Sequence, residues 1–174
     1  MQRFGVDKAL RAAILLLTLA LVAVVASTLR DRVVVAGDSA PDFSVTTDRG
    51  QKVSLDNFGG KVLVLNFWAT WCPPCISELP SLNAMAGELK DSGVVVLGIS
   101  VDKDEAAYQR FLKKVKLNFE TSRDAKADIS SEYGTFKYPE TYVISREGKV
   151  LEKFIADRDW MDPQILARLR GYAR

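Results

Sequence analysis

The sequence predicts an α/β fold in which strands of a central sheet alternate with helices. Residues 62–68 and 94–101 are almost continuously apolar, as expected for strands buried on both faces of a sheet. Between them, apolar residues recur at helical spacing over residues 76–90. The only two cysteines, Cys72 and Cys75, lie at the turn from the first strand into this helix. The rest of the domain is therefore expected to be arranged around this turn.

The N-terminal segment differs in composition from the rest of the 174-residue chain. Residues 12–29 form an uncharged run of 18 residues, which is long enough to span a bilayer and follows basic residues. We therefore predict a single transmembrane helix within residues 1–29, with the N-terminus in the cytoplasm and the remainder outside the membrane. A cleaved signal peptide is the alternative, because Val24-Val25-Ala26 offers a weak small-residue cleavage site.

The remaining chain is predicted to be a linker, residues 30–41, and one globular domain, residues 42–174. The chain has 24 Lys and Arg and 22 Asp and Glu, of which residues 1–29 hold three bases and one acid. The part beyond residue 29 thus has 21 of each and no formal net charge. A neutral domain gives no electrostatic argument for nucleic-acid binding. Two cysteines in one motif also argue against a disulfide-stapled scaffold.

Flanking elements follow from local patterns. Apolar and polar residues alternate around a turn at residues 48–50, which predicts a small β-hairpin before the first core strand. After the second core strand, residues 105–115 are predicted to be helical. The apolar side of that helix comprises Ala107, Phe111, Leu112 and Val115. A loop is expected at residues 56–60, and Pro80 is expected to kink the helix that follows the cysteines.

The C-terminal half contains five further elements. A short strand is predicted at residues 118–121 and a short helix at 128–133. Strands at 140–145 and 150–155 are joined by a hairpin turn, and a last helix begins at Asp162-Pro163.

The cysteine pair is the main candidate for chemistry. A cysteine at a helix N-terminus meets unpaired N–H groups and the positive end of the helix dipole, and both stabilise a thiolate. Because the thiolate is the nucleophile of thiol–disulfide exchange, Cys72 is chemically poised, and Cys75 can resolve the mixed disulfide. A structural disulfide here would constrain the unfolded chain little. A zinc site would need four ligands, but the chain has one cysteine pair and no histidine. A c-type haem site would need histidine directly after the second cysteine, where this chain has Ile76.

Residues 67–75, Phe-Trp-Ala-Thr-Trp-Cys-Pro-Pro-Cys, resemble the active-site signature of the thioredoxin superfamily. The flanking sequence is similar to that of the membrane-anchored TlpA/ResA/CcmG-like thiol–disulfide oxidoreductases of bacteria, over residues 37–170. This resemblance implies a thioredoxin-like fold, with a central mixed β-sheet flanked by helices. It also implies that the hairpin is N-terminal to the sheet and that residues 105–121 are a central αβ insertion.

The same resemblance implies a function and a location. The chain would be a protein disulfide oxidoreductase of the bacterial inner membrane, with its catalytic domain in the periplasm or on the outer face. No cofactor and no metal are expected, because the redox-active group is the Cys72–Cys75 disulfide of the chain itself. Expected partners are protein dithiols and disulfides, including apocytochrome c before haem attachment, and a membrane thiol reductant of the DsbD/CcdA type. The domain is expected to be a monomer that binds no nucleic acid.

Two positions expected to support the cysteines, Tyr138 and Pro139, lie far from them in the sequence. Pro139 matches the cis-proline loop of thioredoxin-like proteins, which faces the active-site cysteines, so the Tyr138–Pro139 bond is expected to be cis. Such a loop would expose a backbone edge with which a substrate segment can pair. The residues alone are equally compatible with a trans proline at the start of an edge strand.

Glu78 is three residues beyond Cys75 and should share its helix face. It matches a helix glutamate of ResA- and CcmG-like proteins, and burial would raise its pKa. Its charge would then disfavour a nearby thiolate, and it could exchange a proton with Cys75. The alternative is a solvated helix glutamate.

The motif itself supplies little positive charge. Trp71, Pro73 and Pro74 are uncharged, and the chain has no histidine. Pro73 also removes one N–H that would stabilise the thiolate. We therefore expect a reducing or intermediate reduction potential.

Two other functions are alternatives to this one. Residues 40–43, Ala-Pro-Asp-Phe, also resemble the start of peroxiredoxins, which suggests a peroxiredoxin-type peroxidase. However, Leu65 and Ala69 occupy the positions at which the peroxidatic motif has proline and a hydroxyl residue. A redox-active binding module or holdase is the non-enzymatic alternative, and it predicts that serine at position 75 leaves partner binding and function intact.

Overall fold

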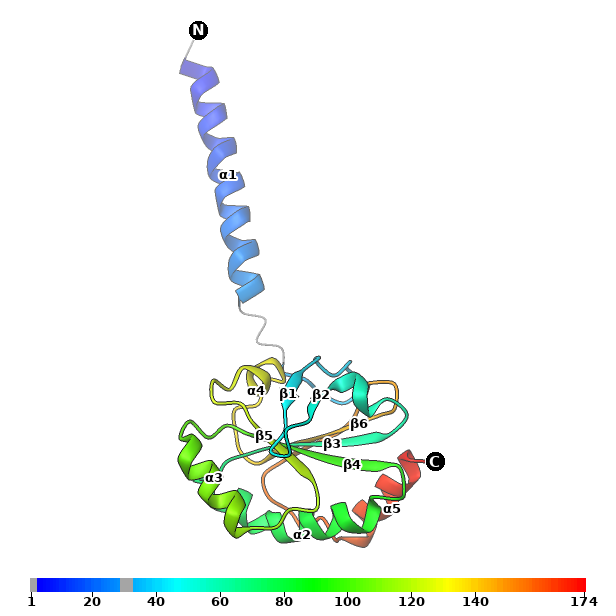
Figure 1. Ribbon diagram of the computed structural model, residues 1–174. Helices are drawn as coiled ribbons and strands as arrows, with labels where there is room; N and C mark the ends of the chain where they lie inside the picture. The colour runs from blue at the N-terminus through cyan, green and yellow to red at the C-terminus, as the bar shows by residue number, and fades with distance from the viewer. Residues whose placement is uncertain (1–2, 29–32) are drawn as a thin grey trace. The chain divides into compact units, whose positions relative to one another are not determined.

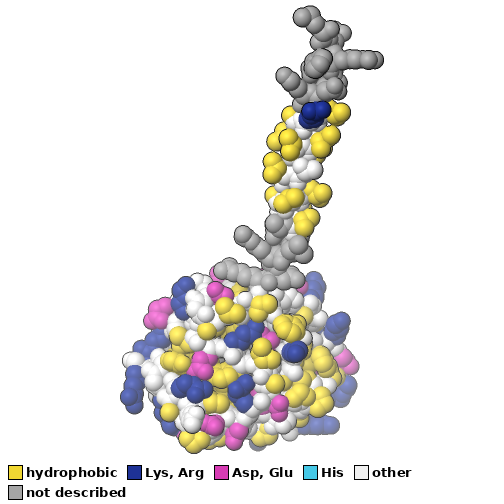
Figure 2. Space-filling view, turned by 180° about the vertical axis from the view of Figure 1, so that it is seen from behind, with side chains coloured by type: hydrophobic (Ala, Val, Ile, Leu, Met, Phe, Trp, Pro, Cys, Tyr) yellow, Lys and Arg dark blue, Asp and Glu magenta, His cyan; other side chains and the backbone are white. Residues whose placement is uncertain are grey.

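The computed structural model describes residues 3–28 and 33–174, with side chains described for residues 10–25 and 33–174. The chain divides into two compact units, the second of which is Val33–Arg174. Helix α1 (Arg3–Thr28) lies in the first unit, and hydrophobic side chains cover its described part (Figure 2). Among the described residues, no helix meets both the length and the apolar character that membrane crossing requires. Leu29, the last residue of the predicted apolar run, lies outside the described residues.

The second unit is built on a mixed sheet of five strands in the order β5-β4-β3-β6-β7 (Figure 1). The central strand β3 (Val62–Trp68) is parallel to β4 (Val94–Ser100) and antiparallel to β6 (Glu140–Ile144). The edge strand β5 (Glu120–Arg123) is parallel to β4, and the opposite edge strand β7 (Val150–Ile155) is antiparallel to β6. The central mixed β-sheet that the thioredoxin resemblance implied is therefore present.

Helices cover the two faces of this sheet. Helices α2 (Pro73–Leu89) and α5 (Pro163–Tyr172) lie below it in the view of Figure 1, whereas α4 (Asp128–Glu132) lies above it. Also above it is a two-stranded antiparallel hairpin, β1 (Ser44–Thr46) with β2 (Lys52–Ser54), at the N-terminal position that the sequence predicted. Helix α3 (Glu105–Lys114) precedes β5, and the two form the αβ segment inserted between β4 and α4.

The burial of β3 on both faces explains why its sequence is apolar apart from Asn66. Val62 and Val64 pack in the cluster that includes residues of α2 and α5. Leu63, Leu65 and Phe67 point the other way and pack in a second cluster. Since successive side chains of a strand alternate between faces, a strand covered on both sides has no position for a solvated residue.

Residues 33–41, predicted as part of a linker, contact the globular unit. Val34 and Ala40 are buried in the second core cluster. The backbone N–H groups of Val34 and Gly37 donate to the carbonyl oxygens of Tyr133 and Val150, over 3.2 and 2.8 Å. The globular unit thus begins at Val33, before the predicted boundary.

Three local features differ from the predictions. Residues 56–58 of the predicted loop belong to a 3₁₀ helix, η1 (Leu55–Phe58), which is capped by Ser54 and Asn57. On α3, Tyr108 is buried, whereas the predicted apolar residues of that helix are only partly buried. Strand β5 begins two residues later than predicted, because Asn118 bonds to Asn83 of α2 through both its backbone and its side chain.

Candidate active site

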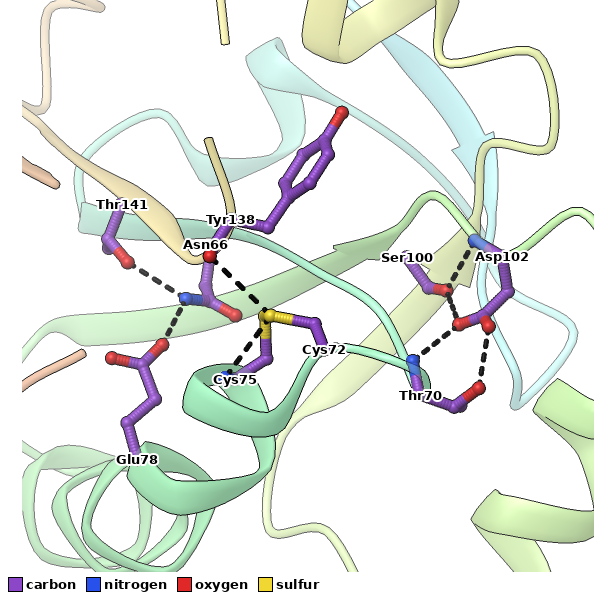
Figure 3. The surroundings of a disulfide bond; sticks show 9 residues. All are labelled: Asn66, Thr70, Cys72, Cys75, Glu78, Ser100, Asp102, Tyr138 and Thr141. Atoms are coloured by element: carbon purple, nitrogen blue, oxygen red, sulfur yellow. Dashed lines mark hydrogen bonds between the residues drawn. A yellow bond between two sulfur atoms is a disulfide. The ribbon is translucent and has the colours of Figure 1, made fainter. Parts of the chain in front are cut away.

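The two cysteines lie at the junction of β3 and α2, as the sequence predicted, and are joined by a disulfide (Figure 3). Cys72 is the N-cap of α2, and its Sγ accepts a hydrogen bond from the backbone N–H of Cys75 over 3.3 Å. Pro73 and Pro74 occupy the first two helical positions, where a missing N–H costs no intrahelical bond.

The two prolines leave one early donor for the sulfur atom. Neither proline has an N–H, and the N–H of Ile76 donates to the carbonyl oxygen of Cys72 over 3.1 Å. The N–H of Cys75 is therefore the helix N-terminal donor that faces Cys72 Sγ. In the reduced protein this donor and the helix dipole would both stabilise a thiolate at Cys72.

The loop with Pro139 lies against the disulfide, although 66 residues separate Cys72 from Tyr138. The Tyr138–Pro139 peptide bond is cis, which confirms the prediction. The carbonyl oxygen of Tyr138 lies 3.5 Å from Cys72 Sγ. Trp71 is 62% exposed, and its ring meets that of Tyr138 nearly perpendicularly, with centroids 6.2 Å apart. The exposed Trp71 and the half-buried Tyr138 are thus the chain neighbours of two buried residues, Cys72 and Pro139.

Glu78 lies inside the protein, on the α2 turn that follows Cys75, so the solvated alternative is wrong. Only 3% of Glu78 is exposed. Its Oε1 accepts from Asn66 Nδ2 over 2.9 Å, and its Oε2 accepts from Trp160 Nε1 over 3.0 Å. Burial raises the pKa of Glu78 to about 7, although the hydrogen bonds from Trp160 and Asn66 act in the opposite direction. Glu78 can therefore change protonation state near neutral pH.

Asn66 connects Glu78 with the strand that follows the cis-proline loop. Its Nδ2 also donates to Thr141 Oγ1 over 2.8 Å, and Asn66 and Thr141 are paired residues of β3 and β6 (Figure 3). An amide flip of Asn66 would present its oxygen to both neighbours, and a hydroxyl can donate as well as accept. The pair can thus serve either a carboxylate or a protonated carboxyl at Glu78.

A second polar cluster, which the sequence analysis missed, holds the turn that precedes Cys72. Asp102 is buried and follows the C-terminal end of β4. Its carboxylate accepts from the backbone N–H and the hydroxyl of Thr70, over 2.9 and 2.6 Å, and from Ser100 Oγ over 2.6 Å (Figure 3). Such charge-assisted bonds fix the backbone just before the cysteine. The only sequence signal was an aspartate that directly follows a buried strand.

Glu140, which directly follows Pro139, is a third buried carboxylate and was also missed. Its Oε1 lies 2.6 Å from Lys153 Nζ of β7 and accepts from the hydroxyl of Tyr142. Its Oε2 is buried without a partner among the described residues. Sequence periodicity gave no sign of this ion pair, because it joins two strands across the sheet.

No metal centre is formed by the described residues, since they contain no group of three or more His, Cys, Asp or Glu arranged to hold an ion. The chemically active groups described above lie together at the C-terminal end of β3 and β4. A disulfide, a cis-proline loop and a titratable carboxyl are the parts of that site.

Comparison with known proteins agrees with this geometry. A family model described as the AhpC/TSA family matches residues 36–153. The chain is 35% identical over 136 residues to thiol-disulfide oxidoreductase ResA of Bacillus cereus, which covers 78% of this chain and 75% of that protein. It is 38% identical over 116 residues to thioredoxin-like protein YneN of Bacillus subtilis, with 66% and 68% covered.

A solved structure shows the same fold. A crystal structure from Chlorobium tepidum, assigned to a thiol:disulfide interchange protein DsbE, superposes with a TM-score of 0.74 and 30% sequence identity. The match covers 80% of this chain and 98% of the other. The chain therefore belongs to the AhpC/TSA family of the thioredoxin superfamily, and it is a thiol–disulfide oxidoreductase of the TlpA/ResA/CcmG-like branch.

Proposed function

We propose that this oxidoreductase reduces disulfides of proteins outside the cytoplasm, with Cys72 as nucleophile and Cys75 as resolving cysteine. The observation that supports this most is the position of Cys72 Sγ, between the N–H of Cys75 and the carbonyl oxygen of Tyr138. The first group stabilises the thiolate, and the second belongs to a cis-proline loop along which an extended substrate segment can pair.

The proposed reaction transfers two electrons from the cysteine pair to the substrate. The Cys72 thiolate attacks one sulfur of the substrate disulfide, and the other substrate sulfur leaves as a thiolate that takes up a proton. Cys75 then loses its proton and attacks Cys72 Sγ, which releases the second substrate thiol and forms the Cys72–Cys75 disulfide. An external dithiol must then reduce this disulfide, and we assign that role to a membrane thiol reductant of the DsbD/CcdA type.

Glu78 is proposed to receive the proton that Cys75 loses. It shares the first turns of α2 with Cys75, and burial raises its pKa to about 7. A base whose pKa lies near the working pH is suited to proton transfer. An ionised Glu78 would also oppose a thiolate at Cys75 until a mixed disulfide has formed at Cys72.

The proposed substrates include apocytochrome c, whose haem-binding cysteines must be reduced before attachment. The reduced protein is expected to convert an oxidised Cys-x-x-Cys-His peptide to its dithiol, with one disulfide formed in the enzyme per peptide. Stopped-flow tryptophan fluorescence and mass spectrometry of acid-quenched samples would follow both products. A matched peptide that carries the same disulfide without the histidine controls for recognition of the haem motif.

The same assay distinguishes the proposed reductase from a peroxiredoxin-type peroxidase. Thr70 is the hydroxyl residue nearest before Cys72, but its hydroxyl donates to Asp102 rather than facing the sulfur. We therefore expect hydrogen peroxide to oxidise the reduced protein far more slowly than the peptide disulfide does. Rapid peroxide turnover together with inert peptide disulfides would overturn the proposed reductase function.

We further propose that the uncharged run at residues 12–29 anchors the protein in the bacterial inner membrane and leaves the catalytic domain outside the cytoplasm. The length of the run and the basic residues before it support this orientation. The chain is expected to sediment with membranes at high salt and at alkaline pH. External protease is expected to digest the domain in intact spheroplasts. Mass spectrometry that finds a native chain shortened at residue 26 would indicate signal-peptide cleavage instead.

A further inference from the structure

A groove lies beside the N-terminal half of β4, at the opposite end of that strand from the disulfide. Strand β5 pairs with β4 only from Leu97, opposite Glu120, to Ser100, opposite Arg123. Residues 94–96 pair with β3 on one side, but no described strand pairs with them on the other. A strand edge of this kind presents backbone N–H and C=O groups to whatever lies beside it.

The chain before β5 is held away from this edge by α2. The backbone N–H of Asn118 donates to Asn83 Oδ1 over 2.6 Å, and its Nδ2 donates to the Asn83 carbonyl oxygen over 3.1 Å. Asn83 Nδ2 in turn donates to the carbonyl oxygen of Lys116 over 3.1 Å. Gly87 allows this close approach, since a Cβ there would lie 3.2 Å from Asn118 Nδ2. These contacts prevent residues 116–118 from continuing the β5 ladder along β4.

The resulting space, here named the β4 edge groove, has a volume of about 430 Å³. Its walls come from α2 on one side and from β2 and η1 on the other, with the β4 edge between them. Apolar side chains that line it are Val53, Phe58, Ala86, Val94, Val96 and Phe119. An apolar floor next to free strand edges favours an extended chain with alternating side chains.

Charge at the groove has one dominant sign. Arg49, Lys52, Lys61 and Lys90 line it, whereas Glu120 is its only lining carboxylate among the described residues. None of the four cations forms an ion pair within 4.0 Å with a described residue. The guanidinium group of Arg49 donates to the carbonyl oxygen of Leu117, but the side-chain ammonium groups of the three lysines have no hydrogen-bond partner in the described chain. The four cations are therefore free to pair with acidic groups of a ligand.

We propose that the β4 edge groove binds an extended, acidic segment of a partner protein, which adds a short strand beside residues 94–96. Three residues of a strand span about 10 Å, which is the length of the β4 edge that β5 leaves unpaired. Alternate side chains of the segment would contact the apolar floor, and acidic side chains between them would meet the four cations. Backbone pairing supplies affinity in this mode of recognition, and the charges select the sequence.

The groove is separate from the disulfide. Six strand residues at about 3.3 Å each place Val94 about 20 Å from Ser100, which bonds to Asp102 at the active-site end of β4. A segment bound in the groove would thus tether a partner without covering Cys72. Because of this distance, binding is expected to be the same for the oxidised and the reduced pair, so it can be measured independently of the proposed reductase function.

The test uses the oxidised full-length protein in a mild non-ionic detergent and a short cysteine-free peptide, acetyl-Glu-Val-Glu-Thr-Glu-amide. Titration is expected to shift the backbone amide resonances of residues 94–96 and 118–120 and to leave those of Cys72 and Cys75 unchanged. The variant with Lys61→Glu and Lys90→Glu should bind about tenfold more weakly, because each reversal replaces an attraction by a repulsion. The matched control reverses Lys113 and Lys114 of α3, which do not line the groove, and should bind like wild type.

Further results decide the proposal. A peptide methylated at alternate backbone nitrogens should lose binding, and Glu120→Gln should strengthen it. Equal affinity for the methylated peptide, or complete competition by inorganic phosphate, would show a simple anion site and overturn strand pairing. Equal weakening by the control pair of substitutions would show that only the overall charge matters. No shift at residues 94–96 at millimolar peptide would exclude the groove as a binding site.

Discussion

Replacing Cys72 with serine is expected to reduce disulfide exchange to the rate of the uncatalysed reaction, whereas replacing Cys75 should leave the first step intact. Cys72 is the N-cap of α2, and its Sγ accepts a hydrogen bond from the N–H of Cys75. The thiolate of Cys72 is therefore the one that is stabilised. Cys75 lies one turn inside the helix and is 1% exposed. The Cys75→Ser protein should therefore react once with a substrate disulfide and remain joined to it through Cys72.

Two measurements check this assignment. Mass spectrometry of the Cys75→Ser protein after reaction should place the substrate on Cys72, and no adduct should form with the Cys72→Ser protein. In the reduced wild type at mildly acidic pH, iodoacetamide should modify Cys72 at least about tenfold faster than Cys75. Faster modification of Cys75 would contradict the assignment. A Cys75→Ser protein that retains full turnover would instead favour the binding-module alternative.

Replacing Glu78 with glutamine is expected to flatten the pH dependence of stability. Burial raises the pKa of Glu78 from 4.5 to about 7, so the folded protein binds this proton more tightly than the unfolded chain does. The contribution of Glu78 to the free energy of unfolding is therefore complete below about pH 4.5, and it is lost as the pH rises through 7. The difference corresponds to about 3 kcal/mol in the free energy of unfolding.

The same substitution is expected to change the redox pair. Above pH 7 an ionised Glu78 disfavours a thiolate at Cys75, and Glu78→Gln removes that charge. The thiol pKa values should fall, the reduced form should gain stability, and the reduction potential should rise. A change of 30 mV corresponds to about 1.4 kcal/mol for this two-electron couple, so a modest coupling is measurable. Below about pH 6 the potentials of wild type and variant should converge, because Glu78 is then protonated.

Urea unfolding of the oxidised proteins between pH 4.5 and 8 would measure the effect on stability. Redox titration at the same pH values would measure the effect on the reduction potential. Glu88→Gln is the matched control, since Glu88 lies on the same helix but is exposed and pairs with Arg170 at the surface. The control should follow wild type in both experiments. Parallel pH profiles for wild type and Glu78→Gln would show that Glu78 has no special role.

The sequence predicted the features that depend on local pattern. The apolar runs predicted β3 and β4, because strands buried on both faces are mostly apolar; Asn66 and Ser100 are buried polar exceptions. The cysteine motif gave the strand-to-helix turn, and the superfamily resemblance gave the cis bond before Pro139. Glu78 was predicted from its helical spacing, but its partners Asn66 and Trp160 come from elsewhere in the chain.

The missed features depend on contacts between distant segments. Asp102 holds Thr70 across 32 residues, and nothing in the local pattern distinguishes it from an aspartate in a loop. Glu140 pairs with Lys153 across neighbouring strands, where alternation predicts only which face each residue takes. The displacement of β5 likewise depends on Asn83, which lies 35 residues earlier on another element. Such contacts follow from the fold and cannot be read from periodicity.

The central claim is that Cys72 and Cys75 form a reducing pair, and its most direct test is the reduction potential of the full-length protein at pH 7. Equilibration in glutathione and dithiothreitol buffers, followed by alkylation and mass spectrometry, would give the oxidised fraction at each poise. With no histidine and two prolines between the cysteines, we expect a value between about −270 mV, as in thioredoxin, and about −180 mV. A value near −120 mV, typical of a strong disulfide-forming oxidant, would contradict the claim.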